Sequence, residues 1–179
     1  MLPPTSRRTR SPYRRRTAAA AAAFALAAAA FLPTAAGAAP ARTAVSVAAA
    51  DSYLTNIRSG AHPTFDRVVL DFSGGVPAYG ISGGPAPLTN CASGAEIPLT
   101  GDQFFEVQAA SAAHDASGNP TYTGPRLVLT PGLARVTGFA VTCDFEGHLN
   151  VGVATRGTVK EVRTMPLTNP SRIVVDVYR

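Results

Sequence analysis

The stretch Asp66–Phe72 reads DRVVLDF, and it has a close copy near the end of the chain, where Ser171–Tyr178 reads SRIVVDVY. Each copy runs polar, Arg, apolar, Val, apolar, Asp, apolar. Because side chains alternate between the two faces of a β-strand, each copy predicts a half-buried strand with its Arg and Asp on the outward face. Two strands built alike, one at each end of the folded part, favour a closed all-β domain.

The two copies can meet in two ways. As antiparallel neighbours in matched register, they would set Arg67 opposite Asp176 and Arg172 opposite Asp71. Parallel neighbours in matched register would oppose like charges, which is unfavourable. The other possibility places the two strands in facing sheets, as equivalent elements of a pseudo-symmetric sandwich.

Short alternating segments separated by Gly, Pro and Asn fill the chain from residue 51 onward. They predict further strands at 53–58, 78–82, 95–99, 103–109, 126–130, 134–145, 148–155 and 159–165. A turn at 99–102 would pair the two segments beside it, Gly138 predicts a bulge, and the Pro-containing stretch 83–92 predicts a surface loop. No segment has apolar residues at helical spacing together with helix-capping residues. The predicted fold class is therefore all-β: a single β-sandwich-like domain of short, mostly antiparallel strands.

Residues 1–38 have the layout of a secretory signal peptide. Arg14–Arg16 form the positive region, Ala18–Leu32 the apolar run, and Ala36–Ala38 a small-residue cleavage site. The apolar run is too short for an ordinary membrane span, so we expect no span after cleavage. The sequence leaves the export route open between general secretion and the twin-arginine pathway. We expect a flexible leader at 39–50 and the folded domain at 51–179.

Removal of the signal changes the charge of the protein. The chain has 16 Lys+Arg and 11 Asp+Glu, but six of the arginines and none of the acidic residues lie in the signal, which leaves ten against 11 and a net charge of −1. A nucleic-acid-binding function therefore loses its main support. Cys91 and Cys143 are the only cysteines. In an exported protein they predict one intramolecular disulfide, rather than two buried free thiols.

Three patterns could carry catalysis, and each has a simpler explanation. Residues 80–84 fit G-x-S-x-G, but the prolines that follow argue against the helix that a nucleophile elbow needs. The three histidines lack the spacing of a zinc site. Asp144 and Glu146 would share a strand face, where two carboxylates are more often solvated than catalytic. We therefore predict a non-enzymatic protein with no catalytic residue, metal or cofactor.

The residues around both copies resemble the AMIN module and, more closely, the AMIN-like domains of exported proteins in high-GC Gram-positive bacteria. The matching elements are Ile57-Arg58, Gly60, 65–72, Tyr79, 145–147, 151–153 and 170–177. The resemblance covers roughly Tyr53–Arg179. It implies a β-sandwich that binds the cell envelope, typically peptidoglycan.

We therefore expect a secreted, non-catalytic binding module of the cell envelope, in contact with peptidoglycan or another wall component. The candidate ligand surface is Arg67, Tyr79 and Arg172, because Arg can pair with the carboxylates of a wall peptide and an aromatic ring can lie against a sugar. A simpler interpretation gives the charges a role in solubility and cross-strand pairing. The alternative functions are a secreted structural factor or one that binds an envelope protein and, with less support, a secreted hydrolase.

Overall fold

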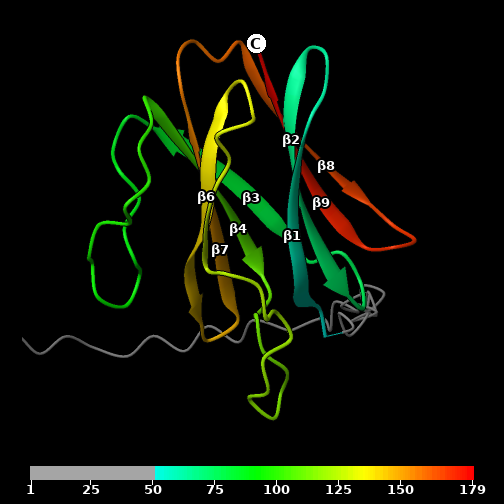
Figure 1. Cartoon of the computed structure of the whole chain (residues 1–179). Helices are drawn as coiled ribbons and strands as arrows, with labels where there is room; N and C mark the ends of the chain where they lie inside the picture. The colour runs from blue at the N-terminus through cyan, green and yellow to red at the C-terminus, as the bar shows by residue number, and fades with distance from the viewer. Residues whose placement is uncertain (1–50) are drawn as a thin grey trace, which may run out of the picture. The chain divides into compact units, whose positions relative to one another are not determined.

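The computed structural model describes residues 51–179, which form two antiparallel β-sheets packed face to face (Figure 1). Sheet A has four strands in the order β1-β2-β9-β8, and sheet B has five in the order β3-β4-β7-β6-β5. This part of the chain contains no helix, and so none long and apolar enough to cross a membrane. The predicted all-β sandwich is confirmed. The predicted signal peptide (1–38) and leader (39–50) lie outside the described residues.

The strands are β1 (Tyr53–Ala61), β2 (Phe65–Ser73), β3 (Tyr79–Gly84), β4 (Gln103–Ala110), β5 (Leu127–Leu129), β6 (Val136–Phe145), β7 (His148–Thr155), β8 (Glu161–Leu167) and β9 (Arg172–Tyr178).

The two copies of the repeated pattern are β2 and β9, and they lie side by side at the centre of sheet A. They pair antiparallel, with Arg67 opposite Asp176 and Asp71 opposite Arg172. The antiparallel prediction is confirmed, and the possibility that the two strands lie in facing sheets is wrong. The register sets unlike charges opposite each other and points the apolar positions of both strands inward.

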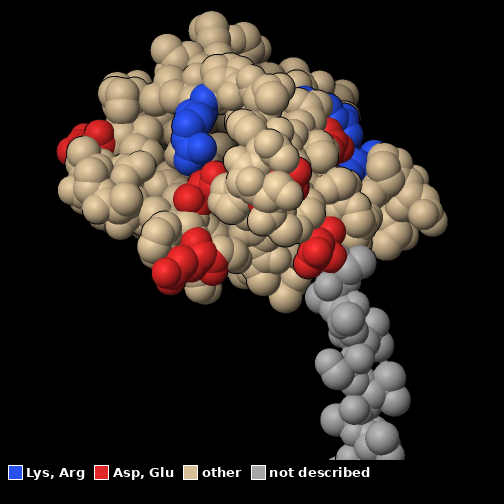
Figure 2. Space-filling view, turned by 90° about the horizontal axis from the view of Figure 1, so that it is seen from below, with Lys and Arg blue, Asp and Glu red and all other residues tan. Residues whose placement is uncertain are grey.

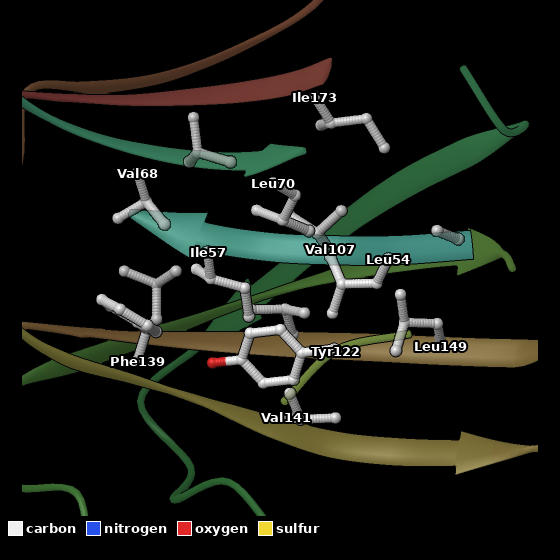
Figure 3. Close-up of a cluster of buried hydrophobic side chains, with 14 of the residues drawn as sticks. Leu54, Ile57, Val68, Leu70, Val107, Tyr122, Phe139, Val141, Leu149 and Ile173 are labelled. Carbon is white, nitrogen blue, oxygen red and sulfur yellow. The ribbon is translucent and has the colours of Figure 1, made fainter. Parts of the chain in front are cut away.

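The main core lies between the sheets and follows the period of two residues along each strand. Its sheet A side comes from inward positions such as Leu54, Val68, Leu70 and Ile173, which are fully buried. Figure 3 shows these side chains meeting others from sheet B and the loops, among them Val107, Tyr122, Phe139, Val141 and Leu149. Burial of such aliphatic side chains contributes about 1.5–3 kcal/mol each.

A second, smaller core lies on the outer face of sheet B and includes side chains of the loop 85–102. Figure 1 shows the course of this loop beside the sheet. The predicted strand 95–99 is wrong: Glu96 makes only an isolated bridge to Thr89, and β4 pairs with β3 and β7 instead. Pro98 has no N–H to donate to a ladder. The alternating Ile97 and Leu99, together with Leu88, instead pack against the sheet, where they contact Phe104, Ala140 and Ala154.

The predicted disulfide is confirmed, and it ties this loop to sheet B. The sulfur atoms of Cys91 and Cys143 are 2.05 Å apart, and the Cα atoms are 5.2 Å apart. The predicted bulge at Gly138 is also confirmed, because the β6–β7 register shifts between Val136 and Gly138. Strand β8 extends through Pro166, which an edge strand tolerates because one side of its backbone has no ladder to complete.

Candidate ligand-binding surface

The three residues of the predicted ligand surface lie on two different sheets. Arg67 and Arg172 are on the outer face of sheet A, four positions apart along the β2–β9 ladder, which is roughly 13 Å at about 3.3 Å per residue. Tyr79 begins β3 in sheet B, is half-buried, and packs against the main core. The candidate surface therefore centres on sheet A, with Arg67 as its starting point.

Arg67 forms a bidentate ion pair with Asp176. Its Nε and Nη2 atoms lie 2.6 and 2.7 Å from the two carboxylate oxygens. The Asp176 side chain is only 1% exposed, whereas that of Arg67 is 31% exposed. The hydrogen bond to Asp176 raises the pKa of Arg67 above that of a free arginine. Because a buried carboxylate needs a partner, this pair supports the structural interpretation of the charges.

A second arginine, which sequence reasoning did not assign to the surface, is fixed in the same way. Arg58 of β1 places Nε and Nη2 at 2.9 and 3.1 Å from the carboxylate of Asp71. The hydrogen bond to Asp71 also raises the pKa of Arg58. Arg172, which lies opposite Asp71 as predicted, donates instead to the backbone oxygen of Pro170. The register between β2 and β9 was predicted correctly, but Asp71 pairs with Arg58 of β1 and not with Arg172.

A hollow of about 130 Å³ lies between Arg58 and Arg67, over Gly60. We call it the Gly60 hollow; its lining is Arg58, Ser59, Gly60, His62, Arg67 and Val69. A Cβ atom on Gly60 would meet nothing within 4 Å. Gly60 pairs with Arg67 in unbroken register, and its φ is not positive, so the backbone does not require a glycine there. A glycine inside a strand often marks a bulge, a bend, or a place where a ligand or another backbone approaches closely.

The His62 ring lines the hollow on one side, and two further aromatic rings continue from it. The His62 ring stacks on Phe65, with centroids 4.4 Å apart and planes 18° apart, and Phe65 lies 5.1 Å from Tyr178. The guanidinium of Arg67 lies over Phe65 at 5.1 Å. Each arginine uses two of its five N–H donors on its aspartate. The hollow thus offers two fixed cations beside an aromatic wall, a setting suited to a carboxylate attached to an apolar or ring-shaped group.

Of the patterns that could have carried catalysis, two residues lie close together: Asp144 is 3.8 Å from Nε2 of His114. The Asp144 carboxylate accepts a hydrogen bond from the backbone N–H of Ala113 and lies 3.7 Å from Arg126. Glu146 does not share its strand face, because β6 ends at Phe145 and Glu146 lies in the turn with φ 48°. Ser82 is an exposed residue inside β3. Between residues 51 and 179, no group of three or more His, Cys, Asp or Glu is placed to hold a metal.

The surface charge does not gather into a basic stripe on the face seen in Figure 2. Acidic groups are spread over that face, and most of its area is uncharged. A continuous basic patch is the usual footprint of a nucleic-acid-binding surface. Here the arginines with the clearest geometry are instead paired with carboxylates.

The family model for the AMIN-like domain matches residues 52–179. The chain belongs to the AMIN-like domain family. The match begins one residue before β1 and runs to the last residue, so this AMIN-like domain comprises both sheets. No curated protein and no solved structure matched the chain. Arg58 and Gly60 could have been found from the sequence, since both belong to the elements that resemble the family.

Proposed function

We propose that this AMIN-like domain is a secreted, non-catalytic module of the bacterial cell envelope that binds peptidoglycan through the Gly60 hollow. AMIN-like domains are generally binding modules rather than enzymes. The observation that carries the proposal is the pair of fixed arginines on either side of a glycine with open space above it. The disulfide supports a location outside the cytoplasm, where such bonds persist.

The chemistry of the hollow suits the peptide part of peptidoglycan. Wall peptides carry free carboxylates, and arginine recognises a carboxylate through parallel N–H donors. Asp71 and Asp176 already hold the two guanidinium groups in place, so little side-chain entropy is lost when a ligand binds. The ring of His62, stacked on Phe65, offers a flat surface beside the cations. A sugar ring or an apolar peptide side chain would lie there.

The two aspartates also neutralise much of the positive charge, so a single contact should be weak and sensitive to salt. Peptidoglycan repeats the same peptide many times along a polymer. A weakly bound module is then retained by rapid rebinding to neighbouring units. We expect binding to the insoluble polymer to be readily detected even where a short soluble fragment binds poorly.

The test is sedimentation of the exported protein with purified peptidoglycan. Gly60→Val places a side chain in the hollow, and its Cβ atom would meet nothing within 4 Å. Gly132→Val is the matched control, since Gly132 is an exposed loop glycine with the same open surroundings. We expect the unmodified protein and Gly132→Val to sediment with the polymer and Gly60→Val to stay in solution.

Two results would count against the proposal in different ways. If the unmodified protein stays in solution, the proposed ligand is wrong. If Gly60→Val sediments as well as the control, peptidoglycan binds elsewhere on the domain.

A further inference from the structure

Strand β3 is an exposed edge of sheet B and lacks the usual protection against pairing with another chain. Among the four edge strands of residues 51–179, β1 has a register shift and Arg58, β5 has three residues, and β8 carries charged residues and Pro166. Strand β3 has six residues, with no charge, no proline and no register shift against β4. Such an edge is a template for strand addition.

The backbone groups that face the free edge can be identified from the ladder. The N–H of Ala110 donates to the oxygen of Ala78 at 2.9 Å, so these two residues form a hydrogen-bonded pair. Hydrogen-bonded and non-bonded pairs alternate along antiparallel strands. The N–H and C=O groups of Tyr79, Ile81 and Gly83 therefore point away from β4. They are available to an added strand.

Hollows lie on both faces of sheet B beside this edge. The inner hollow, of about 440 Å³, is lined by residues including Ile81, Phe105 and Val162. The outer hollow, of about 220 Å³, is lined by residues including Leu88 and Glu106. The side chains of a strand added to β3 would point alternately to these two faces, so successive residues would enter different hollows.

The two hollows differ in the side chains that they would accept. Apolar groups make up most of the exposed lining of both hollows, and the charged residues of the inner one, Lys160 and Glu161, have opposite signs. In the outer hollow, the Glu106 carboxylate accepts hydrogen bonds from Thr142 and Asn150, both uncharged. None of the ion pairs within residues 51–179 includes Glu106. A basic side chain would supply the missing opposite charge.

We propose that the β3 edge binds an extended segment of another polypeptide by strand addition, with apolar side chains in the inner hollow and basic side chains in the outer one. A second copy of this chain fits less well. Its β3 would bring only Gly80, Ser82 and Gly84 to the outer hollow and would leave Glu106 without a cation. This site lies at the β3 edge of sheet B, with part of β8 lining its inner hollow, and shares no residue with the Gly60 hollow.

The experiment uses two synthetic probes, acetyl-VKVKV-amide and acetyl-VEVEV-amide, titrated into isotope-labelled exported protein and followed by NMR. We expect the lysine peptide to shift the amide signals of Tyr79, Ile81 and Gly83 and to slow their hydrogen exchange. The glutamate peptide should bind at least about tenfold more weakly, because its acidic side chains would face Glu106.

Two variants at one position separate the backbone contribution from that of the side chain. Ile81→Pro removes an outward N–H without removing a β3–β4 hydrogen bond, and an edge strand tolerates this change. Ile81→Ala keeps the N–H and shortens the side chain. We expect Ile81→Pro to weaken binding of the lysine peptide at least about tenfold and Ile81→Ala to weaken it less.

Glu106→Gln should remove the preference for lysine over glutamate. Sedimentation of all three variants with peptidoglycan should be unchanged, which separates this test from that of the proposed function.

Each of three results would overturn the inference. The first is that millimolar lysine peptide produces no change at β3. The second is equal binding of the two peptides. The third is a dimer that forms without peptide and is abolished by Ile81→Pro, because the occupant of the edge would then be a second copy of this chain.

Discussion

Gly60 in sheet A and Gly152 in sheet B both lie inside strands on the outer faces of their sheets, and the two glycines have opposite surroundings. At Gly152 in β7, an added Cβ would lie 2.3 Å from Cδ1 of Leu88, which belongs to the loop 85–102. At Gly60 in β1, an added Cβ would meet nothing within 4 Å. Gly152 makes room for the protein's own loop, whereas Gly60 leaves its space unfilled. Gly80 and Gly84 at the edge strand β3 are open as well, but only Gly60 lies between paired arginines, which favours the hollow above it as the binding site for an anionic ligand.

The two sheets also cover their outer faces by different means. In sheet A, apolar outward residues such as Val69 and Val174 are buried beside long side chains from the sheet itself, including the paired arginines. In sheet B, a separate loop supplies the cover, and a disulfide ties it down. The stability of sheet A should therefore depend on charge pairing, and that of the sheet B cover on a covalent tie.

The largest effect is expected in sheet A. Arg67→Ala leaves the Asp176 carboxylate, 1% exposed, without its cation, and should lower the free energy of unfolding by about 3–5 kcal/mol. Urea unfolding followed by circular dichroism measures this. Replacing both partners, Arg67→Met with Asp176→Leu, should recover most of the loss, because no buried charge is left behind. A single variant that loses less than about 1 kcal/mol would show that Asp176 gains solvent or another partner.

The second-largest loss of stability is expected when the disulfide between the loop 85–102 and sheet B is removed. Removing the disulfide with Cys91→Ala and Cys143→Ala should cost about 2–4 kcal/mol, since the bond closes a loop across 52 positions of the sequence. The same unfolding experiment applies, and the reduced unmodified protein is the control, because it lacks the bond but keeps both sulfur atoms. If neither sample is destabilised, the packing of Leu88, Ile97 and Leu99 alone holds the loop.

The same difference between the sheets explains how much the sequence could predict. The register of the β2–β9 pair follows from the repeated pattern once the two strands are taken as neighbours, because antiparallel pairing opposes unlike charges and buries both apolar faces. The packing of the loop 85–102 over sheet B could not be predicted from such a pattern. Ile97 and Leu99 alternate as they would in a strand, but where they pack depends on small residues distant in the sequence, such as Ala140 and Gly138.

The candidate site was predictable only in part, for a related reason. Arg67 is recognisable from the repeat, and Arg58 and Gly60 belong to the family-like elements. The hollow arises only when β1 pairs with β2, which sets Gly60 opposite Arg67. An open space above a glycine is a property of several strands together, and a sequence pattern does not record it. Tyr79 has the residue type expected at a sugar-binding surface, but it faces the core instead.

A third prediction tests the two glycines directly by the same substitution. Gly152→Val should displace Leu88 and lower the free energy of unfolding by about 1–3 kcal/mol through overpacking. Gly60→Val should leave stability within about 0.5 kcal/mol of the unmodified protein or raise it slightly, because valine suits a strand better than glycine does. Thermal unfolding of both variants measures the difference. Equal losses would mean that the Gly60 hollow is not open in solution.

The smallest effect concerns an exposed ion pair of sheet A and its pH dependence. Glu161 lies 2.7 Å from Arg163 at the edge strand β8, with both side chains about half exposed. The hydrogen bond from Arg163 lowers the pKa of Glu161 below its ordinary value of 4.5. A lowered carboxyl pKa stabilises the folded state above the ordinary pKa, and this stabilisation is lost as the pH falls through the folded value. An NMR titration of the Glu161 carboxyl should therefore have its midpoint below 4.5, and Arg163→Gln should move the midpoint back toward 4.5.

Unlike Arg67→Ala, the substitution Arg163→Gln should leave the urea midpoint at neutral pH almost unchanged, because water solvates both groups. A large loss of stability would mean that exposed pairs also hold sheet A together, and burial of Asp176 would no longer explain the special role of Arg67.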